Sequence, residues 1–125
     1  MSWSRSLWMR LAALNNFVAV AVWTYVTVID PGFAEAEQWR LGSQIQFMHG
    51  MAAFTCATFM NVGALSARHA PACFLGGSAL LCSAMYAGAA TTFSGRVAIE
   101  IIGGLVILVG WLVLAWSART IDRTH

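Results

Sequence analysis

Two ionisable side chains, His49 and Glu100, lie inside long apolar stretches of the chain. Ionisable groups are costly in lipid, so they normally face the interior of a helix bundle and find a partner there. If the stretches are antiparallel helices, both residues lie about three residues inside the outer ends of their helices. We therefore treat them as a candidate functional polar pair. The pair could relay protons or bind a quinone headgroup, or it could be a purely structural contact wetted by lipid headgroups.

Three asparagines, Asn15, Asn16 and Asn61, also interrupt apolar stretches, nearer the inner ends of the expected helices. An asparagine in lipid can bond across to a neighbouring helix, and each such contact contributes about 0.6–2 kcal/mol. We expect all three to make structural polar contacts between helices.

The chain has no motif for catalysis, phosphate binding or a metal centre. The thiols are not arranged as CxxC pairs, and a haem held by two histidines would need both of them at one depth. His49 is expected near the outer end, whereas His69 and His125 are expected near the inner end. We therefore predict no catalytic residue, no metal and no bound cofactor, although contact of a quinone, haem or pigment with His49 stays open.

The elements that position these residues are long apolar helices. Hydrophobic residues make up 59% of the 125 positions and charged residues 10%, against about 45–50% and 25% in soluble domains. The net charge of +2 is too small to indicate nucleic acid as a partner. The apolar runs predict four membrane helices, at about 7–29, 45–67, 72–93 and 97–118.

Short connections force neighbouring helices antiparallel, so the predicted fold is all-α, an up-down-up-down bundle of four transmembrane helices forming one domain over residues 1–125. Residues 33–44 are expected to form a short interfacial helix between helices one and two. Five arginines at the inner end against two at the outer end place both termini in the cytoplasm. Six tryptophans are expected to anchor helices at the membrane surfaces: Trp3, Trp8, Trp23, Trp39, Trp111 and Trp116.

Small residues recur in helices three and four at spacings that let helix backbones approach closely in lipid. The expected packing positions are Gly76, Gly77, Ser83, Gly88, Gly103, Gly104 and Gly110.

Helices two to four resemble the small bacterial membrane proteins of domain-of-unknown-function family 423. The likeness is carried by residues 46–52 (QFMHGMA), 74–86 (FLGGSALLCSAMY), 102–105 (IGGL) and 110–112 (GWL). In that family a histidine opens the second helix, a glycine- and serine-rich third helix ends in tyrosine, and GG precedes GW on the fourth. The resemblance implies the same fold and a place in the bacterial inner membrane. It implies no reaction, because the family has no established activity.

Taken together, the sequence favours an accessory or assembly subunit of a larger membrane complex, respiratory or otherwise electron-transferring, with the lipid bilayer and other membrane subunits as partners. Almost no chain lies outside the predicted helices, and one His and one Glu are too few for a long proton relay. The alternative is a protein that uses His49 and Glu100, either to bind quinone alone or to transport a small solute or protons as a homo-oligomer.

Overall fold

The computed structural model describes residues 4–90 and 94–124, and this part of the chain is helical with no strand. Four long helices follow one another; a π-helical turn extends the first helix and a 3-10 segment extends the fourth. Their bounds are α1 Arg5–Thr24 with a π turn at Tyr25–Ile29, α2 Ala36–Asn61, a 3-10 turn at Leu65–His69 leading into α3 Ala70–Ala90, and α4 Arg96–Ser117 with a 3-10 extension at Ala118–Thr124.

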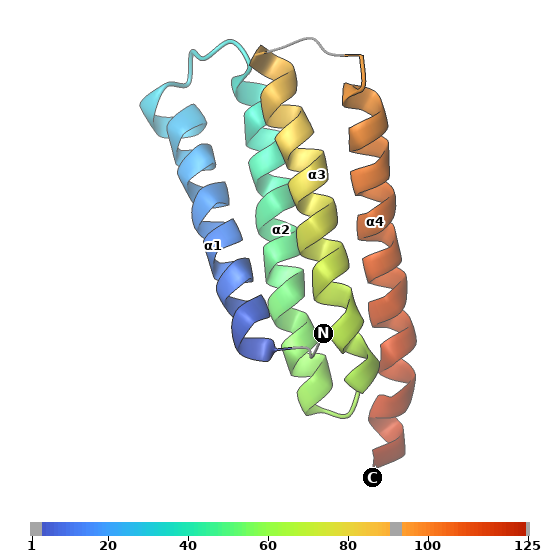
Figure 1. Ribbon diagram of the computed structural model, residues 1–125. Helices are drawn as coiled ribbons and strands as arrows, with labels where there is room; N and C mark the ends of the chain where they lie inside the picture. Colours follow the sequence, from blue (N-terminus) through green and yellow to red (C-terminus); the bar gives the residue numbers. More distant parts are fainter. Residues whose placement is uncertain (1–3, 91–93, 125) are drawn as a thin grey trace.

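The helices lie side by side in chain order and alternate in direction (Figure 1). The main contacts join α1 to α2, α2 to α3 and α3 to α4, so α2 and α3 form the middle of the bundle and α1 and α4 its flanks. The start of α1 and the end of α4 lie at the same end of the bundle in Figure 1, called the lower end below. The opposite end, which carries the loop between α1 and α2, is the upper end.

The second helix starts nine residues before the predicted start at 45 and ends six residues before the predicted end at 67. The stretch at 36–44, expected to form a separate interfacial helix, is instead the first part of α2. It joins the bundle because Ala36, Gly42 and Ser43 are buried against neighbouring helices. The prediction of a separate interfacial helix was therefore wrong. Because α2 starts at Ala36, every polar residue on α2 lies deeper in the bundle than predicted from its upper end.

Gly63 explains why α2 ends early. Its φ of 105° lies in the left-handed region that favours glycine. The N–H of Gly63 donates to the carbonyl of Met60, and the N–H of Ala64 donates to the carbonyl of Phe59. This pair of bonds is a Schellman motif, which satisfies the last carbonyls of a helix and turns the chain away.

The bundle is built with small and polar side chains inside and large apolar ones outside. Phe17 on α1 is 73% exposed and Leu112 on α4 is 70% exposed. The buried side chains are mostly alanine, cysteine and serine, with Phe74 as the largest. Such an arrangement is unfavourable in water and is natural where the surrounding solvent is lipid.

Among residues 4–90 and 94–124, three stretches are long and apolar enough to cross a membrane: Arg5–Ile29, Leu65–Gly88 and Arg96–Asp122. The structure therefore supports a helical membrane protein. Helix α2 is long enough but too polar to count among the three.

Candidate functional site

His49 lies in the middle of the bundle, where α2, α3 and α4 meet. It is the fourteenth of the 26 residues of α2 and is only 7% exposed. Its ring packs against Phe74 of α3 and Trp111 of α4, with ring centroids 6.0 Å and 5.9 Å away. Phe74 and Trp111 also pack edge to face at 4.8 Å. The three rings pack together at the centre of the bundle around one polar contact, the hydrogen bond between Trp111 and His49.

That contact fixes the protonation pattern of His49. The indole N–H of Trp111 donates to Nε2 at 3.2 Å, and an indole nitrogen can only donate. The carbonyl of Ile45 lies 2.7 Å from Nδ1 and can only accept. The ring is therefore the neutral tautomer with its hydrogen on Nδ1. Both nitrogens are engaged, so a haem iron or a pigment metal would have to displace the Trp111 N–H to bind here.

The structure does not bring His49 and Glu100 together. Glu100 accepts from Arg96 on its own helix, with Nε 2.9 Å from Oε1. The residue of α4 that meets His49 is Trp111, which lies eleven positions further on, or about 16 Å along the helix axis. The predicted pairing assumed that α2 begins at Ile45, which placed His49 too close to the upper end. Because α2 begins at Ala36, His49 is far deeper than Glu100.

A chain of neutral amides crosses from α1 to α3 beside His49. The Asn15 side-chain amide donates to the backbone carbonyl of Gln46 at 2.9 Å and to Asn16 Oδ1 at 3.2 Å, and the Gln46 side-chain amide donates back to Asn15 Oδ1 at 3.2 Å. Tyr86 completes the chain by donating to Gln46 Oε1 at 2.8 Å. The amides of Asn15, Asn16 and Gln46 carry no titratable proton. The chain therefore joins three helices but is poorly suited to relaying protons across them.

Gly50 provides the space for the asparagines. A Cβ atom built at Gly50 would collide with Oδ1 of Asn16 and approach Nδ2 of Asn15 to 2.7 Å. Both Gly50 and Asn16 are buried. The absence of a side chain on α2 at this level therefore allows two amides of α1 to enter the interface.

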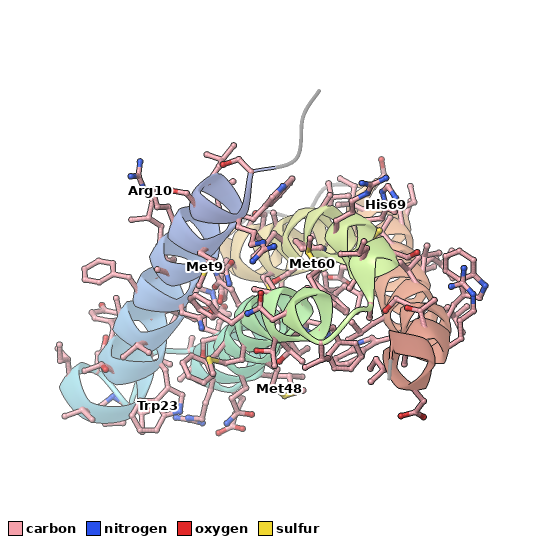
Figure 2. All side chains as sticks on the ribbon, turned by 90° about the horizontal axis from the view of Figure 1, so that it is seen from below. Met9, Arg10, Trp23, Met48, Met60 and His69 are labelled. Carbon is pink, nitrogen blue, oxygen red and sulfur yellow. The ribbon has the colours of Figure 1, made fainter. Side chains whose placement is uncertain are left out.

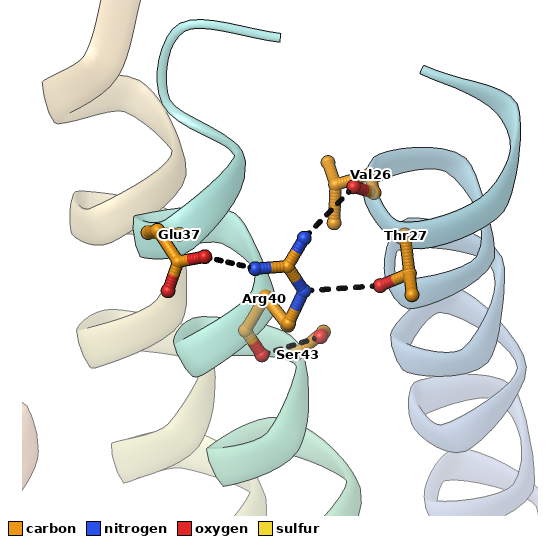
Figure 3. Close-up of polar contacts among 5 residues, drawn as sticks. All are labelled: Val26, Thr27, Glu37, Arg40 and Ser43. Atoms are coloured by element: carbon orange, nitrogen blue, oxygen red, sulfur yellow. Dashed lines mark hydrogen bonds and ion pairs between the residues drawn. The ribbon is translucent and has the colours of Figure 1, made fainter. Parts of the chain in front are cut away.

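Arg40 ties the upper ends of α1 and α2 together (Figure 3). Its guanidinium donates to Thr27 Oγ1 and to the Val26 carbonyl, both at 3.1 Å, and forms an ion pair with Glu37. The Val26 carbonyl needs such a donor. The Asp30 N–H donates to the Tyr25 carbonyl in the π turn. The next residue, Pro31, has no N–H that could donate to the Val26 carbonyl.

At the lower end, Arg5 of α1 donates to Asn61 of α2 at 2.8 Å. Together with the Asn15 and Arg40 contacts, this holds α1 to α2 by polar bonds at three depths. Asn15 and Asn61 thus bond across the interface between α1 and α2, whereas Asn16 accepts from Asn15 on its own helix and lies against Gly50.

The interface between α3 and α4 is held differently, by close backbone approach. A Cβ at Gly77 would lie 2.8 Å from the carbonyl oxygen of Gly103, and one at Gly103 would lie 2.7 Å from the backbone nitrogen of Leu81. Gly110 is similarly crowded by Cys73 and Phe74. Gly77 and Gly103 therefore allow the two backbones to touch, and Gly110 leaves room for the side chains of Cys73 and Phe74.

The other predicted packing positions do not lie in this contact. A Cβ at Gly76 or Gly104 would meet nothing within 4 Å, Ser83 is exposed, and Gly88 makes room for the Arg96 side chain. Gly76 comes one residue before the packed Gly77, and Gly104 comes one residue after the packed Gly103. Adjacent residues point about 100° apart around a helix, so only one of each pair can face the partner.

The tryptophans differ in what they contact. Trp116 is exposed and stacks under the guanidinium of Arg119, 3.3 Å from the ring centre. Trp8 and Trp23 lie near opposite ends of α1, and Trp39 packs on Phe33 and Tyr86. Trp111 was expected as an anchor at the membrane surface; it is 43% exposed, but it lies midway along the bundle, where its indole N–H bonds to His49. Trp3 lies outside the described residues.

Within residues 4–90 and 94–124 no three His, Cys, Asp or Glu side chains are grouped to hold a metal ion. The three thiols, Cys56, Cys73 and Cys82, are free. Cys82 donates to the Gly42 carbonyl at 3.2 Å and thereby links α3 to α2. The site at the centre of the bundle therefore offers hydrogen bonds and aromatic contacts.

No family model, curated protein or solved structure matches the chain. The resemblance to family 423 therefore stays a prediction. Among the residues that carry it, His49 bonds to Trp111, and Tyr86 bonds to Gln46.

Gln46, Gly50 and Arg40 were not singled out as site residues from the sequence. Arg40 and Gln46 lay on either side of the assumed start of a membrane helix, where polar residues need no partner. Reading one continuous helix from residue 36 would have placed both on faces that meet neighbouring helices. The sequence feature that could have indicated this continuous helix is the helix-compatible stretch AEAEQWRLGSQ.

Proposed function

We propose that this chain is an accessory or assembly subunit that spans the bacterial inner membrane and docks a helix of a larger membrane complex on α3. The observation that supports the proposal is a second small-residue face on α3. A cleft of about 500 Å³ is lined there by Gly76, Ala79, Ser83 and neighbouring residues of α3, together with Ile99 of α4. Gly76, Ala79 and Ser83 are exposed.

The contrast with Gly77 explains why this face suits a partner helix. Gly77 lets the α4 backbone approach, whereas a side chain at Gly76 would enter open space. Small residues recurring along an exposed helix let a second helix approach closely, and such packing is a main source of helix association in lipid. The α3 helix thus carries two faces of the same kind, of which α4 covers one.

We further propose that all four helices cross the membrane, with both termini in the cytoplasm. Helices α1 and α3 run in the same direction (Figure 1), so if both cross, α2 must cross back between them. Its 26 residues span about 39 Å, which exceeds the roughly 30 Å of a hydrocarbon core. Its polar residues lower its hydropathy, but Gln46 and His49 bond inside the bundle, whereas Phe47, Met48 and Met51 are exposed.

Cysteine labelling tests the topology. Glu37→Cys at the upper end should react with a membrane-impermeant maleimide in intact cells. Leu65→Cys, in the turn after α2, and Asp122→Cys should react only after permeabilisation. The unmodified chain, with its three native thiols, is the background control. Labelling of Glu37→Cys and Leu65→Cys from the same side would show that α2 does not cross.

The docking proposal is tested by a photo-crosslinking residue at Ser83 in native membranes. We expect one defined crosslinked subunit, lost in an Ala79→Leu background because the added side chain fills the cleft. Ala13→Leu on the exposed face of α1 adds the same bulk elsewhere and should leave the crosslink unchanged. A pure homo-oligomer whose quinone binding or transport depends on His49 would contradict the proposal and favour the alternative function.

A further inference from the structure

Two adjoining hollows at the upper end differ sharply in chemistry. The first is a polar cleft of about 640 Å³, lined by Glu37, Gln38, Arg40, Leu41, Gln44, Met85, Arg96 and Glu100. The second is an apolar groove of about 390 Å³ between α1 and α2, lined by Ala19, Val20, Trp23, Ser43, Gln44, Phe47 and Met48. Trp23 and Met48 lie on the same side of the bundle in Figure 2. Gln44 lines both hollows, so they lie next to each other.

The polar cleft contains two arginines and two glutamates, so its formal charge is zero. Arg40 uses three of its five N–H donors on Thr27, Val26 and Glu37. Arg96 uses its Nε toward Glu100, and no bond of its terminal nitrogens is found among the described residues. The Arg96 and Glu100 side chains are 33% and 23% exposed. Cationic N–H donors of the two arginines and anionic carboxylate acceptors of the two glutamates therefore remain for a ligand.

We propose that the two hollows together bind one phospholipid with a zwitterionic, primary-ammonium headgroup. The guanidinium groups of Arg40 and Arg96 bind its phosphate, since planar N–H pairs match phosphate oxygens. The carboxylates of Glu37 and Glu100 accept from its ammonium group. One acyl chain lies in the apolar groove beside Trp23, at the level where indole rings meet headgroups.

The charge balance selects this headgroup over its competitors. An anionic headgroup would bring a net negative charge to a neutral cleft containing two carboxylates. A trimethylated ammonium has no N–H to donate to Glu100. The inference rests on the proposed insertion of the bundle in a membrane, but it is independent of the partner subunit on α3.

The test is native mass spectrometry of the purified chain released from nanodiscs of phosphatidylethanolamine, phosphatidylglycerol and phosphatidylcholine in equal amounts. We expect one retained phosphatidylethanolamine. Arg96→Gln should weaken retention about tenfold, the effect of losing roughly 1.4 kcal/mol. Arg119→Gln removes a guanidinium at the lower end and should change nothing. Equal retention of the three lipids, or retention unaffected by Arg96→Gln, would overturn the proposal.

Two further variants keep the result interpretable. Glu100→Gln should reduce the preference for phosphatidylethanolamine over phosphatidylcholine while leaving phosphate binding intact. Val20→Trp should fill the groove and lower retention of all two-chain lipids. Thermal unfolding in detergent reports whether each variant is folded. We expect all of them to fold, because Val20 is exposed and Arg96 and Glu100 are only half-buried. Failure of the chain to enter nanodiscs at all would instead count against membrane insertion.

Discussion

Gly103→Ala should lower the free energy of unfolding by about 1–3 kcal/mol, the usual cost of overpacking a tight interface. The added methyl group would lie 2.7 Å from the backbone nitrogen of Leu81 and 2.8 Å from the backbone oxygen of Gly77. Backbone atoms cannot move aside as a side chain can, so α3 and α4 must separate along their whole contact. That separation would also disturb Gly110 and the rings packed around His49.

The neighbouring glycine is the matched control for this prediction. Gly104→Ala adds the same methyl group where nothing lies within 4 Å, and alanine favours helix over glycine by up to about 1 kcal/mol. It should therefore be neutral or slightly stabilising. Gly77→Ala and Gly76→Ala form a second pair with the same contrast on α3. Unfolding in mixed micelles measures all four, and equal effects within each pair would show that α3 and α4 do not pack through Gly77 and Gly103.

Trp111→Phe should destabilise the bundle by about 1–3 kcal/mol, because it leaves Nε2 of His49 buried without a donor. Phenylalanine keeps an aromatic ring against Phe74, so the variant tests the hydrogen bond more than the packing. His49→Phe removes the acceptor and leaves the indole N–H of Trp111 without its partner. The double variant should cost less than the sum of the two single variants.

A double-mutant cycle on the free energy of unfolding measures this coupling, which we expect to be about 0.6–2 kcal/mol. The same cycle on His49 and Glu100 is the control. Those two residues bond to different partners at different depths, so their effects should add. Additive behaviour of His49 and Trp111, or strong coupling of His49 with Glu100, would contradict the observed arrangement.

The polar residues of α2 show where sequence reasoning loses accuracy. A hydropathy pattern places a helix boundary where polar residues begin, and that rule moved the start of α2 from residue 36 to residue 45. The boundary depends on whether Arg40 and Gln46 have partners on other helices. Those partners, Thr27, Asn15 and Tyr86, are between 13 and 40 residues away in sequence. A local pattern carries no information about contacts at that separation.

The sequence by itself determined the helical class and the apolar character of three of the four stretches predicted to cross the membrane. These follow from composition and periodicity, which act locally along the chain. Only the tertiary structure decided that Gly77 and Gly103 touch while Gly76 and Gly104 do not, and that Trp111 rather than Glu100 meets His49. Both outcomes depend on the rotation of each helix about its axis and on its shift along a neighbour. Packing of the whole bundle sets these two quantities, and one residue of rotation or three turns of shift exchanges one partner for another.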